Sequence, residues 1–394
     1  MTLSDLKFEG RRVLVRVDFN VPLDSSLNVQ DDTRIRRALP TINTLLEGGA
    51  SVVLMSHLGR PKGKSAELSL KNIVPCLEKL LGKSVKFASD CVGDLALEVT
   101  QNLKAGEVVL LENLRFHPEE KEGDEFFAGQ LAENGDVYVN DAFGTAHRAH
   151  ASTAIIARFF PEDKAFGELM VAEIEALRKV MAKPSRPLLA IIGGAKVSSK
   201  LAILENMVED VDRLMIGGGM AYTFILAKGG RVGASLVEEE MVERAKKVLE
   251  KALECNTEVF LPVDSICADR FSEDANFEIC NSSEIENGWM GLDIGPIACS
   301  EFEEAVRTSK TVLWNGPMGV FEFKSCAKGT FSVAQALKEA TETGAYTLVG
   351  GGDSVAAINA AGLAGDVSYV STGGGAMLEY LEGKTLPGIK AIEE

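Results

Sequence analysis

Short, continuous apolar runs recur along the chain, with helical spacing of apolar residues between them. A run without an alternating polar face predicts a strand that is buried on both sides, which is typical of a parallel sheet covered by helices. The predicted strands are residues 12–17, 51–55, 107–111 and 136–139 in the first half, and 187–192, 213–216, 257–261, 311–314 and 346–349 in the second. The pattern therefore predicts two α/β layers, one in each half.

A connecting helix is predicted between these two layers. Residues 166–181 place Leu169, Ile174 and Leu177 close to helical spacing, and the run ends before Pro184. No sequence repeat relates the two halves, so we expect any likeness between them to lie in their architecture only.

Composition and charge narrow the classes of function. The 394 residues are 46% hydrophobic and 25% charged, which indicates a globular chain that is too long for one core. The formal net charge of −17 argues against binding to nucleic acid or to an anionic membrane, because either needs a basic surface. Residues 1–150 carry 18 Lys and Arg against 22 Asp and Glu, a net charge of −4, and the rest carries 23 against 36, a net charge of −13. The first half also contains all four histidines, so we expect it to bind small anions.

Neither a secretory signal nor an apolar run long enough to span a bilayer is recognisable in the sequence. The seven cysteines are scattered, and none forms a Cys-x-x-Cys pair that would indicate zinc or redox chemistry. We therefore expect reduced thiols in a cytoplasmic protein.

Four glycine-rich turns follow predicted strands in the second half, at residues 193–194, 217–219, 315–319 and 350–352. Ligands of open parallel sheets bind at the carboxyl ends of strands, where residues without Cβ let backbone N–H groups approach phosphate oxygens. One such turn is more often simple packing, but four after successive strands favour a phosphate-binding edge.

Two lysines after the first glycine turn and two residues after the last one can each be interpreted either structurally or functionally. Lys196 and Lys200, four residues apart, would share one helix face and could neutralise a phosphoryl group in transfer, although exposed lysines are usually only solvated. Asp353 and Ser354 lie where a helix N-cap is expected. Asp353 could equally hold Mg²⁺ against nucleotide phosphates, because Mg²⁺ prefers few carboxylates with phosphate oxygens and water.

Candidates for anion binding in the first half also follow predicted strands. Arg34 begins a predicted helix, and guanidinium groups suit phosphate and carboxylate oxygens. A lone arginine is more often a solvated side chain, and His57 could be structural. Asp18 could either balance the arginines or accept a hydroxyl group from a substrate. The candidates that follow strands are Asp18, Asn20, His57, Arg60, Arg115 and residues 147–150.

The half with the glycine turns contains no histidine, so a histidine base would have to come from the other half. A carboxylate acceptor is already ionised near neutral pH and would need no base. Residues 59–65 resemble a Walker A loop but have Leu58 where the first glycine belongs, and no glycine cluster completes G-x-G-x-x-G. Neither a P-loop ATPase nor a typical dinucleotide enzyme is supported.

Longer motifs resemble the phosphoglycerate kinase family over essentially the whole chain and in the family's order. They are RVDFNVP at 16–22, SHLGRP at 56–61, LLENLRFHPEE at 110–120, NDAFGTAHRAHAS at 140–152, GGAKVSSK at 193–200, WNGPMGVFE at 314–322, GGGDS at 350–354 and STGGGAMLEYLEGKTLPG at 371–388.

The resemblance implies an α/β fold of two doubly wound, Rossmann-like parallel-sheet domains, joined by a long helix and a hinge, with a cleft between them. Residues 1–167 would bind 3-phosphoglycerate, and residues 168–371 would bind nucleotide, with 168–182 as the connecting helix. Residues 372–394 would return to the N-terminal domain. The family also implies a cytoplasmic monomer without nucleic-acid or membrane partners.

The implied activity is reversible phosphoryl transfer between ATP, with Mg²⁺, and the carboxylate of 3-phosphoglycerate, in glycolysis, gluconeogenesis or carbon fixation. Matched by motif, the catalytic residues would be Arg34, Lys196, Gly351 and Gly352, and the metal-binding residue Asp353. The substrate-binding residues would be Asp18, Phe19, Asn20, Arg34, His57, Leu58, Gly59, Arg60, Arg115 and Arg148. The nucleotide-binding residues would be Gly194, Lys196, Lys200, Gly217, Gly218, Gly219, Gly291, Leu292, Asn315, Pro317, Val320, Glu322, Gly350, Gly351, Gly352, Asp353 and Ser354.

Two other functions stay open at this point. A nicotinamide dehydrogenase would also use paired α/β lobes with glycine turns, but this sequence lacks the G-x-G-x-x-G fingerprint of dinucleotide binding. A catalytically inactive binding protein on the same fold would be expected to have lost Arg34, Lys196 or Asp353, and all three are present.

Overall fold

The chain, described over residues 1–394 by a computed structural model, divides into two units. The first comprises Met1–Glu175 with Thr385–Glu394, and the second comprises Ala176–Lys384. The sequence-based boundaries lie at 167/168 and 371/372, whereas the first boundary of this division, 175/176, lies inside α6 (Glu168–Met181). Residues just before 385 belong with the second unit because α13 (Gly375–Leu381) packs on α7 (Leu201–Met207) there.

The first unit is built on a six-stranded sheet in the order β3-β4-β2-β1-β5-β6, and all of its pairings are parallel. The strands are β1 (Arg12–Val17), β2 (Ser51–Met55), β3 (Val85–Ala88), β4 (Val108–Leu111), β5 (Val137–Asp141) and β6 (Lys164–Phe166). The helices are α1 (Thr33–Glu47), α2 (Val74–Leu81), α3 (Asp94–Thr100), α4 (Glu119–Glu122), α5 (Glu125–Ala132) and α14 (Pro387–Glu393). The predicted parallel sheet is confirmed.

Burial explains why these residues form these elements. Every residue of β2 and β4 is buried, as the continuous apolar runs predict for central strands. In α1, Ile35, Ala38 and Ile42 are buried at helical spacing, so one stripe of this helix faces the core. Each large apolar side chain buried in this way contributes about 1.5–3 kcal/mol.

The second unit repeats the architecture. Its six-stranded sheet has the order β10-β8-β7-β15-β16-β17, again with parallel pairings throughout. The strands are β7 (Leu188–Ile192), β8 (Arg213–Ile216), β10 (Glu258–Phe260), β15 (Thr311–Asn315), β16 (Tyr346–Val349) and β17 (Tyr369–Val370). The helices, besides α6, α7 and α13, are α8 (Met220–Ala227), α9 (Val242–Cys255), α10 (Pro296–Arg307), α11 (Lys328–Glu342) and α12 (Gly352–Ala360).

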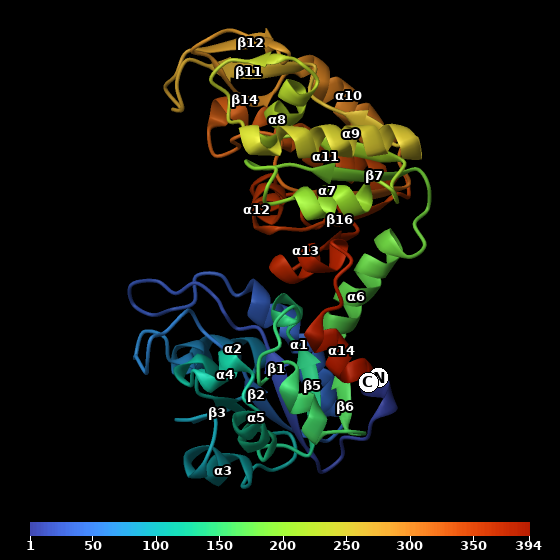
Figure 1. Cartoon of the computed structure of the whole chain (residues 1–394). Helices are drawn as coiled ribbons and strands as arrows, with labels where there is room; N and C mark the ends of the chain where they lie inside the picture. The colour runs from blue at the N-terminus through green and yellow to red at the C-terminus, as the bar shows by residue number, and fades with distance from the viewer. The chain divides into compact units, whose positions relative to one another are not determined.

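Two small sheets that the sequence pattern did not predict are added to the second unit. One is antiparallel, in the order β12-β11-β14, and the other pairs β9 with β13 in parallel. Their strands are β9 (Arg231–Val232), β11 (Asp264–Ala268), β12 (Phe277–Asn281), β13 (Glu284–Ile285) and β14 (Met290–Ile294). In Figure 1 the strands β11, β12 and β14 lie side by side at the end of this unit. Short 3₁₀ helices cover 3–5, 70–73, 114–116, 143–145, 155–159, 239–241 and 324–326.

The last ten residues are built into the first unit. Lys164 at the start of β6 donates a hydrogen bond to the Ala391 carbonyl at 2.8 Å, and the Gly388 N–H donates to the Ala146 carbonyl at 2.8 Å. Ile392 is 1% exposed. Figure 1 shows α14 beside β6, with the two chain termini close together.

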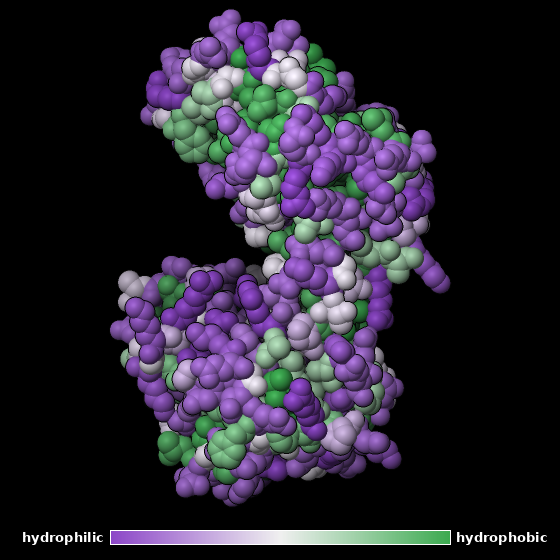
Figure 2. Space-filling view, in the orientation of Figure 1, coloured by the Kyte–Doolittle hydropathy of each residue, from purple (hydrophilic) through white to green (hydrophobic).

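The surface carries scattered apolar side chains, and the faces visible in Figure 2 are mainly hydrophilic. No helix combines the length and the apolar character that crossing a membrane requires. All seven cysteines are free thiols.

Candidate active site

Polar residues of the first unit gather at one edge of its sheet. The strands β4, β2, β1 and β5 are neighbours, and because they are parallel, the segments that follow them lie at the same edge. Arg34 joins this edge from the first turn of α1. We call the following side chains, which influence one another electrostatically, the basic cluster: Arg16, Arg34, Arg60, Arg115, Arg148, His57, His147 and His150.

The basic cluster keeps two of its histidines neutral. Burial lowers the pKa of His57 well below its usual value, and the charges of Arg16 and Arg115 lower it further. Burial and the same two arginines lower the pKa of His150 to about 4. Burial also lowers the pKa of Arg115. Positive charge concentrated in this way indicates a site for an anion.

Asp18 connects the strand end to the start of α1. Its carboxylate lies 2.8 Å from the Arg34 guanidinium and accepts the Asn20 N–H at 3.2 Å. The Asn20 side chain in turn accepts the Gly59 N–H at 2.8 Å. The side chain of Arg34 is 40% exposed and that of Asp18 only 11%. Asp18 thus holds one terminal nitrogen of the Arg34 guanidinium, and the rest of this group is free for a ligand.

Arg16, which the sequence analysis did not single out, is the buried centre of the basic cluster. It is 0% exposed and donates to Ser152 Oγ at 2.9 Å and to the Val17 carbonyl. Its remaining nitrogen lies 3.1 Å from Nδ1 of His57. Arginine can only donate, so Nδ1 accepts and the proton of neutral His57 is on Nε2. An arginine in the middle of the apolar run VLVRV was the available signal.

The charge of Arg16 is balanced indirectly. Ser152 Oγ donates to the fully buried Glu120 at 2.6 Å, and the Ser152 N–H donates to the same carboxylate at 3.0 Å. Because a buried ion needs a fully satisfied shell, this chain of hydrogen bonds fixes both Arg16 and the tautomer of His57.

Arg115 is positioned by its backbone surroundings. Its guanidinium donates to the Gly59 carbonyl at 2.7 Å, and its N–H donates to the Asn113 side chain at 3.0 Å. The Asn113 amide also donates to the Leu58 carbonyl at 2.8 Å. The loops after β2 and β4 are therefore joined, which keeps Arg115 beside the segment that contains His57.

Two of the predicted substrate residues have buried side chains. Phe19 and Leu58 belong to the apolar core of the first unit. Phe19 donates its N–H to Ser56 Oγ at 2.9 Å, and Leu58 bonds through its backbone to Asn113. Their side chains hold the neighbouring loop in place, so a ligand contact would have to be made by the backbone.

In the second unit, the four glycine turns converge. They follow β8, β7, β15 and β16, which are neighbours in the sheet. The Gly194 N–H donates to the Pro317 carbonyl at 3.1 Å, and the Gly218 N–H donates to the Met318 carbonyl at 3.0 Å. Gly218 has φ +68°, and an added Cβ would lie 2.6 Å from the Gly194 carbonyl oxygen. The turns pack so closely that a side chain here would collide with backbone.

Lys196 and Lys200 do not share a helix face, so this prediction is wrong. The helix α7 begins only at Leu201, because side chains between the two lysines compete for hydrogen bonds. The Ser198 N–H donates to Glu238 at 2.9 Å, and Ser199 Oγ donates to the Lys196 carbonyl at 2.8 Å. Lys196 is exposed and forms no ion pair with the protein.

Asp353 and Ser354 do not cap α12. Gly351, with φ +90°, is the N-cap residue, and no side chain caps this helix. Asp353 is exposed in the first turn, and its charge acts on Lys200. Ser354 is buried and accepts the Gly316 N–H. The carboxylate of Asp353 is thus free to meet a ligand, and Ser354 secures the neighbouring turn.

The remaining predicted nucleotide residues surround the same turns. Asn315 is fully buried, donates to the Gly350 carbonyl at 2.8 Å, and its Oδ1 accepts no hydrogen bond from the protein. The Val320 N–H donates to the Leu292 carbonyl at 2.8 Å, which joins the end of the turn at 315–319 to β14. Glu322 is exposed.

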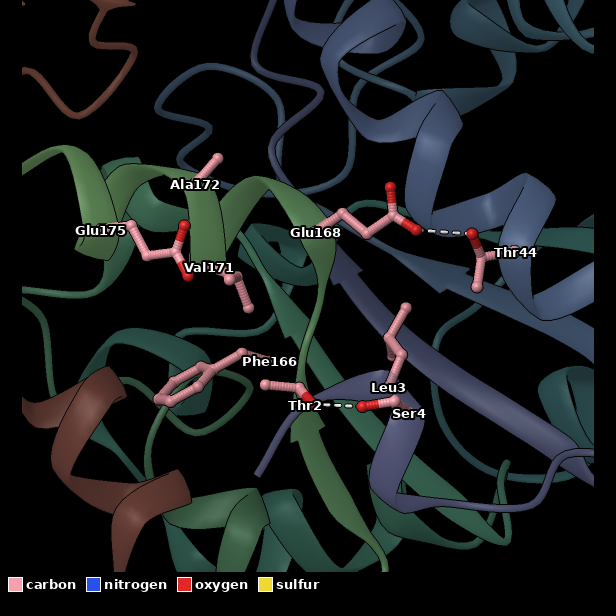
Figure 3. A pocket seen from close by; sticks show the side chains of 9 residues that line it. All are labelled: Thr2, Leu3, Ser4, Thr44, Phe166, Glu168, Val171, Ala172 and Glu175. Carbon is pink, nitrogen blue, oxygen red and sulfur yellow. Dashed lines mark hydrogen bonds between the residues drawn. The ribbon is translucent and has the colours of Figure 1, made fainter.

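A separate surface pocket of about 410 Å³ lies at the start of α6. Figure 3 shows it between the N-terminal segment, α1 and α6, with Thr44 donating to Glu168. No predicted site residue and no basic side chain lines it, so it does not suit an anionic substrate.

The chain is similar to known proteins over its whole length. The family model of phosphoglycerate kinase matches residues 3–384. The phosphoglycerate kinase of Chloroherpeton thalassium is 54% identical, covering 99% of this chain and 98% of its own. That of Porphyromonas gingivalis is 49% identical, covering 100% of both chains. The solved structure of phosphoglycerate kinase from Coxiella burnetii is similar with a TM-score of 0.91 at 41% identity, covering 100% of this chain and 98% of that one.

Proposed function

Because this chain belongs to the phosphoglycerate kinase family, we propose that it transfers a phosphoryl group reversibly between ATP and the carboxylate of 3-phosphoglycerate. The products of the forward transfer are ADP and 1,3-bisphosphoglycerate, a reaction of glycolysis. The observation that carries the proposal is the family match over residues 3–384. The enzyme is a phosphotransferase whose acceptor is a carboxyl group.

We propose that the basic cluster binds 3-phosphoglycerate. His57, Arg60, Arg115 and Arg148 would hold the phosphate group at the far end of the substrate, and Arg34 would lie nearest its carboxylate. Guanidinium groups bind such oxygens in pairs, and neutral His57 offers its Nε2–H as a further donor. Asp18 and Asn20, together with the backbone of 57–59, would bind the substrate hydroxyl and complete the pocket.

We propose that the transfer needs no general base. The carboxylate of 3-phosphoglycerate is ionised at neutral pH and is itself the nucleophile. What the protein has to supply is alignment of the acceptor oxygen with phosphorus and positive charge for the oxygens of the moving group. Arg34 and Lys196 would supply that charge, with the backbone of Gly351 and Gly352 at the start of α12.

The glycine turns of the second unit are proposed to hold the nucleotide. Residues 217–219, 291–292, 317 and 320 would surround adenine, Glu322 would bind the ribose, and Lys200, Asn315 and residues 350–354 would contact the phosphates. The exposed carboxylate of Asp353 beside the uncapped start of α12 fits Mg²⁺, which takes few carboxylates and shares phosphate oxygens. Bound there, Mg²⁺ would neutralise phosphate charge.

We further propose that the protein works as a cytoplasmic monomer, with residues 1–167 as the substrate domain, 168–371 as the nucleotide domain and 372–394 as the returning tail. Transfer would require a hinge that brings the two bound anions together in a cleft closed to water, because water would hydrolyse an acyl phosphate.

A coupled assay tests the function. The purified chain is mixed with 3-phosphoglycerate, MgATP, NADH and glyceraldehyde-3-phosphate dehydrogenase, and NADH oxidation is followed. We expect oxidation that depends on both the chain and 3-phosphoglycerate. A rate equal to that of the mixture without the chain would overturn the proposal.

The pH dependence of nucleotide use should report on Lys200. Burial lowers its pKa to about 8, and the charge of Asp353 partly opposes this. The ammonium group is charged below that pH and loses its charge above it, so kcat/KM for MgATP should fall as the pH rises through about 8. Lys200→Arg keeps its charge throughout this range and should not show the decline. The same decline in both proteins would contradict the role of Lys200.

A further inference from the structure

Three potential metal ligands meet in the first unit, outside the basic cluster. Asp90 and Cys91 follow β3, and His117 follows the 3₁₀ helix at 114–116. A carboxylate oxygen, the thiol sulfur and an imidazole nitrogen of these residues all lie within 4.8 Å of one another. We propose that Asp90, Cys91 and His117 form a binding site for a zinc-like divalent cation.

The donor set is suited to such an ion. Thiolate and imidazole ligands favour Zn²⁺ and Co²⁺, whereas Mg²⁺ prefers oxygen ligands. Bonds of about 2.3 Å to sulfur and about 2.0 Å to nitrogen and oxygen require the three donor atoms to lie close together. Asp90 Oδ1 and His117 Nε2 already lie 2.7 Å apart. A water molecule would provide the fourth ligand, as in open zinc sites.

Neighbouring groups hold the three side chains in place. The Cys91 N–H donates to Asp90 Oδ1 at 2.8 Å, and Asn134 donates to the Cys91 carbonyl at 3.2 Å. The His117 ring packs against Phe127 with 5.1 Å between ring centroids. Such surrounding contacts are what orient ligands in metal sites. Cys91 is fully buried, but 24% of the His117 side chain is exposed, so an ion can enter from that side.

The site currently contains a cation of the protein's own. Lys64, from the loop that resembles a Walker A sequence, places its ammonium 2.6 Å from Asp90 Oδ2. Its side chain is 58% exposed and is therefore able to move away. On metal binding, the Cys91 S–H bond breaks, the proton goes to solvent, and a sulfur–metal bond forms. His117 loses to solvent the Nε2 proton that it donates to Asp90, and Nδ1 carries the remaining ring proton. The freed lone pair of Nε2 then binds the metal, and the Asp90 carboxylate binds the metal in place of that hydrogen bond.

Titration of the nucleotide-free chain with Co²⁺ tests the proposal, because a cobalt–thiolate bond produces a charge-transfer absorption band. We expect one equivalent of Co²⁺ to give this band, Zn²⁺ to remove it and excess Mg²⁺ to leave it. Cys91→Ser should abolish the band, and His117→Gln should weaken binding by at least about 10-fold. Lys64→Met, which removes the competing ammonium, should strengthen binding.

Matched controls make the result decisive. Cys255→Ser, at an exposed cysteine, should keep the full band. Circular dichroism establishes whether each variant is folded. If Cys91→Ser is not folded, the Co²⁺ affinity of His117→Gln, a variant at a partly exposed position, decides the test. Absence of the band in the unmodified chain, its persistence in Cys91→Ser, or equal affinity in His117→Gln would each overturn the proposal. Weaker binding by Lys64→Met would also contradict it.

Discussion

Arg34→Ala is expected to lower kcat on the order of 100-fold, which corresponds to roughly 2.7 kcal/mol of transition-state stabilisation. Arg34 is held by Asp18 at 2.8 Å, and its partly exposed guanidinium is proposed to lie next to the acceptor carboxylate. Loss of this charge would act mainly on the transition state, where negative charge is spread over the moving phosphoryl group. The KM for MgATP should change by less than about twofold. Steady-state kinetics in the coupled assay measure both constants.

Arg36→Ala is the matched control, because Arg36 lies on the same helix and forms an exposed ion pair with Asp32 at 2.8 Å. Exposed pairs contribute about 0–1 kcal/mol, so this variant should keep its activity. Arg34→Lys should recover only part of the rate, since lysine lacks the planar fork. A kcat of Arg34→Ala within about twofold of the unmodified enzyme, roughly 0.4 kcal/mol, would exclude Arg34 from the chemistry.

Lys196→Ala is expected to reduce kcat by a similar factor, on the order of 100-fold. The ammonium of Lys196 is exposed beside the turn at 193–194 and forms no ion pair, so it is available for the phosphoryl group in transfer. Its loss should leave the binding of nucleotide within about threefold, because Lys200 and the glycine turns remain. Nucleotide affinity is measured separately by calorimetry.

Lys247→Ala provides the comparison for this second variant. Lys247 is an exposed lysine of α9 in the same unit, and it is far in sequence from every glycine turn. If both variants show equal and small changes in kcat, general surface charge accounts for the effect, and Lys196 has no special role. A loss of nucleotide affinity with kcat unchanged would instead assign Lys196 to ground-state binding.

The central strands could be predicted from sequence, and the edges could not. β2 and β4 are continuous apolar runs with every residue buried, which is a strong signal. The edge strand β3 exposes Lys86, and β17 has only two residues, so neither contains a run long enough to recognise. The antiparallel sheet is formed by pairing between β11 and its neighbours, and pairing leaves no local signal.

The residues of the candidate site could be predicted where a suitable residue type follows the end of a strand. His57 and Arg115 follow strands, and only the motif resemblance assigned both to one substrate site, because the strand order that brings them together was not predicted. Arg16 was missed because its role depends on Ser152 and Glu120, which are distant in sequence. The helix expected through Lys196 was wrong because Ser198 binds Glu238, a contact that spacing cannot reveal.

The position of α14 has a consequence for the order in which the molecule is completed. A chain made from its N-terminus presents residues 1–175 first, yet the first unit also contains residues 385–394. The Ala391 carbonyl that accepts from Lys164 and the buried side chain of Ile392 arrive last. Although domains generally fold as they emerge from the ribosome, the unit synthesised first can close its core only when translation has passed through the unit synthesised second.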